Sequence, residues 1–351
     1  MTQFIGTSDI RTLLETIGIE PFLAGLADYV EADFRRWEMF EKAARLASHS
    51  RDGVIELMPA SDGELYAMKF VNGHPKNTGE GKLTVTAFGV LADVATGYPL
   101  LVSEMTILTA LRTAATSAVA ARALARPGAQ VLALIGAGAQ SEFQALAFRA
   151  LLGIAEVRVF DLDTEAVDKF CHNLAGSGLR IHRAASTADA VAGADIVTTA
   201  TATKARAAVL TPEMIQPGVH LNAIGGDCPG KTELHPDVVA AASVFTEFTP
   251  QTRIEGEIQQ MAPDFGVTEL WQVLTGNAPG RRTATEVTLF DSVGFAVEDF
   301  STLRYVRDLT RGAVRDIDLV PELDDPKDLF GLAVPAHRPV PASVLEDVLA
   351  G

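Results

Sequence analysis

The sequence predicts an α/β protein of two domains, and three features lead to this expectation. The chain has 351 residues, which is more than a single hydrophobic core usually organises. Up to about residue 120, short strand-like runs follow one another through turns. From about residue 127, strand-like runs alternate with helical segments, as in βαβ units. We therefore expect an α+β domain followed by a domain with a parallel sheet.

The first domain is expected to span residues 1–120 and to be rejoined by about 312–335. It opens with apolar residues at helical spacing over 22–45. Four strand-like runs separated by glycine-containing turns come next, and a helical stretch covers 104–125. Such hairpins predict a largely antiparallel sheet, with strands near 54–60, 65–73, 83–94 and 98–105.

The second domain is expected over residues 121–311, with 336–351, rich in Pro and Ala, as a flexible tail. Its first strand is predicted at 131–135, its first helix at 141–153 and its next strand at 156–163. Later members of the series are "RIHRA", "DIVTTA", "VHLNAIGG", "SVFTEF" and "EVTLFDSVGFAVEDFSTLRYV".

Composition narrows the class of function. The net charge of −16 would repel a nucleic acid and favour a cationic small molecule, although many soluble proteins are acidic. Cys171 and Cys228 lie far apart, which fits a reducing cytoplasm. No apolar run has membrane-spanning length, and the first residues lack the pattern of a secretory signal. We expect a cytoplasmic protein with no membrane partner and, since no dense His, Cys and Asp group occurs, no metal.

A glycine-rich stretch follows the predicted strand at 131–135. Gly136 and Gly138 fit the first two positions of the motif G-x-G-x-x-G, and Ser141 replaces the third glycine. Glycines let the backbone approach a pyrophosphate, which the next helix N-terminus then attracts. Asp161 ends the following strand, 20 residues after Ser141 (161 − 141), where an acid binds the ribose. The stretch predicts a Rossmann-like domain that prefers NAD to NADP; the alternative is a glycine turn beside a surface aspartate.

Asp227 stands at a corner with little side chain around it, in "NAIGGDCPGKTEL". The preceding run fits a later strand of the parallel sheet, and ligands bind beyond the carboxyl ends of such strands. A carboxylate there could move protons during oxidation of an amine. Alternatively, Asp227 caps a helix or forms a turn, as Asp before Pro-Gly often does.

Four charged residues of the first domain stand among apolar neighbours. They are Arg45, Glu56, Lys69 and Arg112. Charged groups in such runs usually need partners or a ligand, and arginine can grip a carboxylate with two hydrogen bonds. The alternative is that each is the solvent-facing residue of its element.

Taken together, these stretches resemble the ornithine cyclodeaminase and mu-crystallin family, in its bacterial cyclodeaminase branch. The resemblance covers nearly the whole chain to about residue 330, and the tail lies outside it. Its matching stretches include "RLASHS", "GVIELMP", "KFVNGHPKNT", "AFGVLADVATGYPLLVSE", "TALRTAATS", "ALIGAGAQSEFQALAF", "HLNAIGGDCPGKTEL", "PQTRIEGEIQQ", "FDSVGFAVED" and "DDPKDLF".

The resemblance implies a homodimer whose first domain binds substrate and builds the dimer. It also implies conversion of L-ornithine to L-proline and ammonia, with NAD reduced and reoxidised in each turnover. Such a lyase would serve ornithine degradation and proline biosynthesis. Alternatives are a lysine cyclodeaminase, an NAD-dependent alanine dehydrogenase or ketimine reductase, and a non-catalytic crystallin-like NAD-binding protein.

Site residues follow from the resemblance position by position. Asp227 matches the general acid/base, and Glu56 an acidic residue of the substrate site. The substrate carboxylate would be held by Arg45, Lys69 and Arg112, and Val293 would line the pocket. Besides Gly136 and Gly138, the implied NAD contacts are Thr84, Arg112, Ala139, Gln140, Asp161, Thr201, Asn222, Ala223, Ile224, Lys231 and Ser292.

Overall fold

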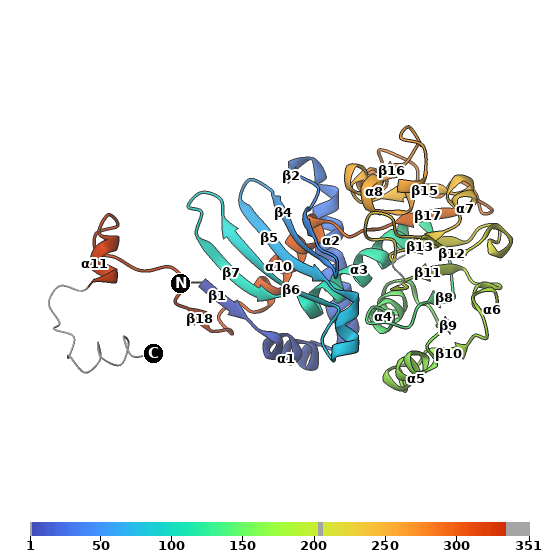
Figure 1. Cartoon of the computed structure of the whole chain (residues 1–351), viewed down its shortest axis with the longest axis horizontal. Helices are drawn as coiled ribbons and strands as arrows, with labels where there is room; N and C mark the ends of the chain where they lie inside the picture. Colours follow the sequence, from blue (N-terminus) through green and yellow to red (C-terminus); the bar gives the residue numbers. More distant parts are fainter. Residues whose placement is uncertain (1, 203–205, 335–351) are drawn as a thin grey trace.

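The computed structural model describes residues 2–202 and 206–334 and contains two large sheets (Figure 1). Three helices lie between them: α2 (Ile19–Arg35), α3 (Thr106–Leu124) and α4 (Ser141–Leu152). One sheet is mostly antiparallel and the other is entirely parallel. The predicted α/β class, with an α+β part and a Rossmann-like part, is confirmed. Residues 336–351, expected as a tail, lie outside the described residues.

The first sheet has the strand order β18-β1-β7-β6-β5-β4-β2, and β3 also pairs with β4. Its central strands form the predicted hairpins, and β1 joins β7 in parallel. The chain returns to this sheet when β18 pairs with β1. The strands are β1 (Thr2–Ile5), β2 (Glu41–Lys42), β3 (Leu46–His49), β4 (Val54–Ser61), β5 (Leu65–Gly73), β6 (Val85–Asp93), β7 (Pro99–Glu104) and β18 (Asp316–Ile317).

The helix expected over 22–45 ends at Arg35, so the second half of that prediction was wrong. A short 3-10 turn, η1 (Trp37–Met39), follows, and then β2 and β3 pair with β4. Trp37 is buried against Phe34, with ring centroids 5.0 Å apart. Pairing with a distant strand therefore overrides the local helical spacing.

Helix α10 (Ala296–Leu309) packs on the first sheet. It contacts α2, β4, β5 and β6. Residues 296–309, expected in the second domain, therefore pack on the first sheet instead. The chain thus crosses back to the first sheet directly after strand β17 (Thr288–Asp291). This crossing brings residues near 293 to the junction between the two sheets.

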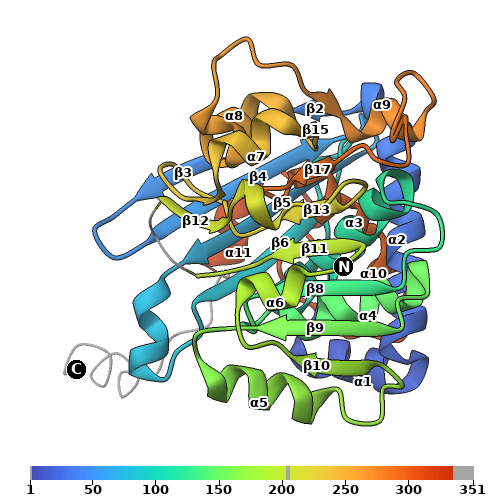
Figure 2. The same ribbon diagram turned by 90° about the vertical axis from the view of Figure 1, so that its right-hand side faces the viewer.

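The parallel sheet has the order β10-β9-β8-β11-β13-β17-β15-β16, and its strands lie side by side in Figure 2. The order reverses between β8 and β11, which is where such sheets bind ligands. A small pair, β12 (Arg206–Leu210) with β14 (Thr232–Leu234), lies beside it. The eight strands are β8 (Val131–Ile135), β9 (Glu156–Phe160), β10 (Arg180–Arg183), β11 (Ile196–Thr199), β13 (His220–Ala223), β15 (Ser243–Thr246), β16 (Thr268–Glu269) and β17 (Thr288–Asp291).

The remaining helices are short, apart from α1 and α5. Within the described ranges, no helix combines the length and apolar character needed to cross a membrane. The remaining helices and 3-10 turns are α1 (Thr7–Ile17), η2 (Pro75–Glu80), α5 (Thr164–Asn173), α6 (Thr187–Val191), η3 (Pro212–Met214), α7 (Pro236–Ala241), α8 (Thr249–Glu255), η4 (Glu257–Gln260), α9 (Leu270–Leu274) and α11 (Leu329–Ala333).

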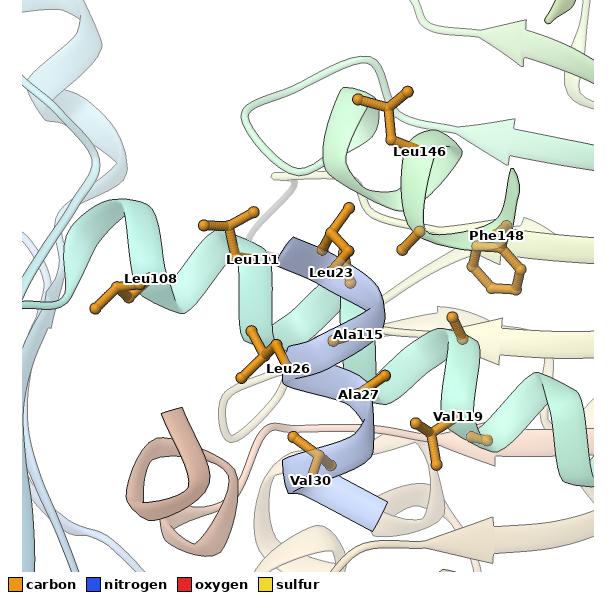
Figure 3. Close-up of a cluster of buried hydrophobic side chains, with 14 of the residues drawn as sticks. Leu23, Leu26, Ala27, Val30, Leu108, Leu111, Ala115, Val119, Leu146 and Phe148 are labelled. Carbon is orange, nitrogen blue, oxygen red and sulfur yellow. The ribbon is translucent and has the colours of Figure 1, made fainter. Parts of the chain in front are cut away.

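Helix α3 joins the two halves of the molecule. It is rich in alanine and packs against both α2 and α4, as Figure 3 shows for Ala115, Leu23, Leu26 and Phe148. Small side chains let the helix axes approach closely, and all four residues are fully buried. One hydrophobic cluster therefore continues across both domains and fixes the junction between them.

We expect Ala115→Leu to destabilise the fold by about 1–3 kcal/mol, because the closely packed interior has no room for the added carbons. Thermal unfolding would show a lower midpoint. The control is Ala188→Leu on the exposed side of α6, which should change stability by less than about 0.5 kcal/mol. An unchanged midpoint for Ala115→Leu would contradict this packing.

Candidate functional site

The glycine-rich loop lies at the strand-order switch, between β8 and α4. Gly136 has φ +107°, and a Cβ there would lie 2.5 Å from the carbonyl oxygen of Ala200. Only glycine fits such a position. Ser141 is fully buried, and its hydroxyl donates to the Gly138 carbonyl oxygen over 2.7 Å. The serine thus closes the loop where the motif has a third glycine, and Gly138 and Ala139 remain exposed.

Asp161 lies directly beside this loop, at the end of β9. One carboxylate oxygen accepts from the backbone N–H of Ala137 over 2.7 Å, and the other accepts from that of Asp163 over 2.9 Å. The carboxylate is therefore fixed next to the turn that would approach a pyrophosphate. This arrangement suits a ribose hydroxyl, and its negative charge disfavours a 2′-phosphate.

The ends of β11 and β13 continue the same edge. Asn222 is buried and donates from Nδ2 to Thr198 Oγ1 over 3.2 Å, while its Oδ1 has no hydrogen-bond partner in the described part of the chain. Ile224 donates its N–H to the Thr199 carbonyl, and the N–H of Thr201 donates to Glu233 over 2.7 Å. A glycine loop, a fixed acid and an unpaired amide oxygen on one edge fit a dinucleotide.

Lys69 on β5 and Arg112 on α3 share one acceptor. Lys69 Nζ lies 2.8 Å and Arg112 Nε 3.1 Å from Asp299 Oδ1, and Arg112 Nη1 donates to Glu298 over 2.5 Å. All four side chains are buried. Burial and the nearby Arg112 lower the pKa of Lys69 to about 8, and burial raises the pKa of Glu298 to about 8. Paired in this way, two cations can be held inside the protein.

Arg45 is held from several sides. Its Nη1 donates to Glu56 over 3.0 Å, its Nη2 donates to the carbonyl oxygens of Val293 and Gly294, and its Nε lies 3.1 Å from Glu255. Burial, together with the charge of Glu56, raises the pKa of Glu255 to about 7, against the opposing effect of Arg45. The arginine therefore lies fixed at the start of α10.

Gly294 brings the two cation groups together. It has φ +72°, and a Cβ there would lie 2.5 Å from Arg112 Nη1, while its carbonyl accepts from Arg45. The preceding Ser292 is buried and donates to Glu247 over 2.5 Å. Arg45, Arg112 and Val293 thus meet where β17 runs into α10, at the junction of the two sheets.

Asp227 lies in the loop between β13 and β14, and its side chain is 54% exposed. Its carboxylate accepts from Lys231 over 3.2 Å, so it pairs with a side chain instead of capping a helix. Lys231 itself is buried, and the charges of Asp227 and Glu233 raise its pKa despite that burial. Asp227 thus presents a solvent-reachable carboxylate beside a fixed cation.

Two buried acids explain the glycines before Asp227. A Cβ on Gly225 would lie 2.1 Å from Glu233 Oε2, and one on Gly226 would lie 2.7 Å from Glu257 Oε1. Glu257 in turn accepts from the N–H groups of Glu233 and Leu234 over 2.7 and 3.1 Å. The loop carrying Asp227 is therefore pressed against carboxylates that leave room only for glycine.

Several acidic residues of this site were missed by the sequence analysis. The run "FAVEDF" places two acids among apolar residues, a signal that could have identified Glu298 and Asp299 in the way that it identified Lys69. The other acids follow no such pattern. They are Glu233, Glu247, Glu255, Glu257 and Asp291.

Thr84 shares no hydrogen bond with the site residues described above. Its carbonyl oxygen accepts from the N–H of His74 and from Asn72 within the β5–β6 hairpin. Its side chain makes no hydrogen bond within residues 2–202 and 206–334, so its expected role at the cofactor stays a prediction. Those ranges also contain no cluster of His, Cys, Asp and Glu arranged to hold a metal ion.

Fold and site together define a Rossmann-like, dinucleotide-binding protein with a charged small-molecule site at its domain junction. The chain belongs to the ornithine cyclodeaminase/mu-crystallin family, whose model matches residues 8–313. The resemblance expected from the sequence is thereby confirmed.

Relatives and solved structures agree with this membership. An ornithine cyclodeaminase of Agrobacterium fabrum is 60% identical over 334 residues, covering 95% of this chain and 94% of the relative. The structure of a lysine cyclodeaminase, studied for recognition of L-lysine, L-ornithine and L-2,4-diaminobutyric acid, has a TM-score of 0.88 at 29% identity, covering 94% and 99%. An archaeal alanine dehydrogenase dimer with bound NAD has a TM-score of 0.82 at 28% identity, covering 91% and 99%.

Binding of a simple carboxylate near Lys69 is expected to weaken as the pH rises through about 8. Only the charged ammonium attracts an anion, and a pKa of about 8 places the loss of its proton between about pH 7 and pH 9. The dissociation constant of pentanoate, which has no amine of its own, should rise about tenfold over that interval. Lys69→Arg, which stays charged, should flatten the profile. Identical profiles for both proteins would contradict the contact.

Proposed function

We propose that the protein is an ornithine cyclodeaminase that converts L-ornithine to L-proline and ammonia with catalytic NAD. The observation that carries the proposal is the 60% identity, over 95% of the chain, to a relative of that name. The site supports it, because Arg45, Lys69, Arg112 and Asp227 lie around the domain junction beside the dinucleotide-binding edge. Asp161 supports NAD as the form of the cofactor.

The donors left free around Lys69 and Arg112 suit the substrate carboxylate. Lys69 uses one of its three N–H groups on Asp299. Arg112 Nη2 has no hydrogen-bond partner within the described residues, because Nε and Nη1 take the acids. Arg45 is more fully occupied, with three of its five N–H groups in hydrogen bonds, so it would contribute mainly charge. A carboxylate gripped in this way fixes the α-carbon.

Asp227 would serve as the proton acceptor and donor at the α-nitrogen. Oxidation of an amino acid needs a neutral amine, so a base must first remove a proton. Lys231 donates to the Asp227 carboxylate over 3.2 Å and so holds it in place. The same carboxyl group can later give its proton to the departing ammonia. NAD, when bound, supplies the acceptor for the α-hydride and returns that hydride to the cyclic imine.

Sequence similarity to known enzymes favours ornithine over lysine as the substrate. The lysine cyclodeaminase structure shares 29% identity with this chain, against 60% for the ornithine enzyme. One methylene changes binding by only about 1–3 kcal/mol, so lysine remains the alternative substrate to test. The net charge of −16 suits a cationic diamino acid. The same proposal places the enzyme in the cytoplasm, in ornithine degradation and proline biosynthesis, which fits a chain whose two cysteines lie far apart in sequence.

The decisive experiment supplies L-ornithine in large excess over a trace of NAD and quantifies proline and ammonia. Equal amounts of both, far above the amount of NAD, are expected from a redox-neutral cyclodeaminase. Product limited to the amount of NAD would indicate an alanine dehydrogenase or ketimine reductase instead. Absence of product from ornithine and lysine, with NAD bound, would favour a crystallin-like binding protein.

Asp227→Asn should lower kcat by about 10²–10⁴-fold while NAD binding is kept, because the amide cannot exchange the proton. The matched control is Asp237→Asn, an exposed acid on α7, which should leave turnover unchanged. Full turnover by Asp227→Asn would overturn the assigned role.

We further propose that the protein is a homodimer built by the outer face of the first sheet, whose domain also binds the substrate. That face is apolar although no helix of the described chain covers it. Leu57 is 40%, Tyr66 42% and Phe88 45% exposed, and Phe70 stacks on Phe88 with ring centroids 5.1 Å apart. An apolar face of this kind usually marks an interface, and the alanine dehydrogenase neighbour is a dimer.

Leu57→Glu should therefore reduce the mass measured in solution by half, because a charge would be buried without a partner. Light scattering coupled to size-exclusion chromatography measures this molecular mass. Leu329→Glu on α11, also at an exposed leucine, should leave the mass unchanged. A monomeric wild-type protein would contradict the dimer.

A further inference from the structure

Three side chains spaced four residues apart run along α8 and η4 and face the site. Gln251 accepts from the backbone N–H of Arg45 over 3.0 Å and donates to the Gly294 carbonyl over 2.9 Å. Gln259 accepts from the N–H of Gly230 over 2.6 Å, within the Asp227 loop. Glu255 lies between them. Its position therefore places its carboxylate between Arg45 and the Asp227 loop.

The Glu255 carboxylate is buried but incompletely paired. The residue is 5% exposed, and its Oε2 lies 3.1 Å from Arg45 Nε. Neither of these two atoms makes a hydrogen bond within the described residues. Leaving a buried carboxylate oxygen without a donor is costly, and a catalytic role or a bound ligand is one explanation for such an atom.

The charge around Glu255 selects a cation. Glu56, Glu255 and Asp227 all act on the single guanidinium of Arg45. Three carboxylates against two cations, Arg45 and the Lys231 that pairs with Asp227, leave this end of the site negative. Glu298 and Asp299 also have unpaired oxygens, but they lie against the cations Lys69 and Arg112 and would meet a positive ligand beside positive charges.

We propose that Glu255 binds the distal amino group of the diamino acid and removes its proton before ring closure. The inference rests on the proposed cyclodeaminase function. It separates the site into a cationic end for the substrate carboxylate, at Lys69 and Arg112, and an acidic end for the side-chain amine.

Ring closure and loss of ammonia need no reactant beyond the oxidised substrate, Glu255 and Asp227. A distal N–H bond breaks and its proton passes to Glu255, which leaves a nitrogen lone pair. That pair forms the ring C–N bond at the oxidised α-carbon, and the electron pair of the C=N bond moves to the α-nitrogen. The α-nitrogen takes a proton from Asp227, and the ring nitrogen passes its second proton to the carboxylate thus freed. The bond between the α-carbon and the α-nitrogen then breaks, ammonia leaves with the electron pair, and the ring-nitrogen lone pair forms the C=N bond of the cyclic imine. A pKa of about 7, raised by burial and by Glu56 and Asp227, suits Glu255 to accept a proton near neutral pH.

The test compares binding of L-ornithine and L-norvaline, an amino acid of the same length without the distal amine. Titration calorimetry is performed with NADH bound, so that no turnover occurs. Wild-type protein should prefer ornithine. Glu255→Gln should weaken ornithine binding about tenfold or more, the loss of one charge-assisted hydrogen bond, and leave norvaline unchanged.

One control separates this role from support of Arg45. Glu56→Gln removes the other acid that contacts Arg45, and a variant that only displaces Arg45 should weaken both ligands equally. Equal weakening by Glu255→Gln, or loss of the ornithine preference in Glu56→Gln alone, would overturn the assignment. If Glu255→Gln does not fold, Glu255→Asp serves, with a reduced preference expected and an unchanged preference contradicting it. Failure of wild-type protein to form proline would instead refute the proposed function.

Discussion

The arrangement of the site depends on one shared acceptor, the Asp299 carboxylate oxygen that contacts both Lys69 and Arg112. Lys69 comes from the antiparallel sheet, Arg112 from the helix that joins the domains, and Asp299 from the helix that crosses back. Two buried cations would repel each other and weaken the fold without such a partner. Their pairing fixes three segments at the domain junction and leaves donors free for an anionic ligand.

Buried acids also organise the other side of the site, where their carboxylates accept hydrogen bonds from backbone N–H groups. Asp291 accepts from the N–H groups of Glu257 and Ile258 over 2.8 and 2.9 Å, and Glu257 holds the strand after the Asp227 loop. Burial raises the pKa of Asp291 to about 7 and of Glu257 to about 8. Asp227 looks bare because the two residues before it are glycines, and they are glycines because the carboxylates of Glu233 and Glu257 occupy the space behind them.

Local patterns in the sequence were sufficient for the strands, the glycine loop and the acid at Asp161, since each depends on nearby residues. They failed at the end of α2, where β2 and β3 pair with a strand further along the chain. They also failed for Glu255 and Asp299, whose partners are distant; Lys69 and Asp299 are 230 positions apart. The roles of the site residues came from resemblance, and the structure adds which of them touch.

In the proposed reaction, one site removes hydrogen from the α-carbon of ornithine, closes the ring and returns the same hydrogen. The most direct measurement uses L-ornithine deuterated at the α-carbon, with unlabelled NAD, and mass spectrometry of the proline. We expect nearly all proline to carry the deuterium at its α-carbon. Proline without deuterium, or deuterium accumulating in the cofactor, would contradict a closed cycle within one site.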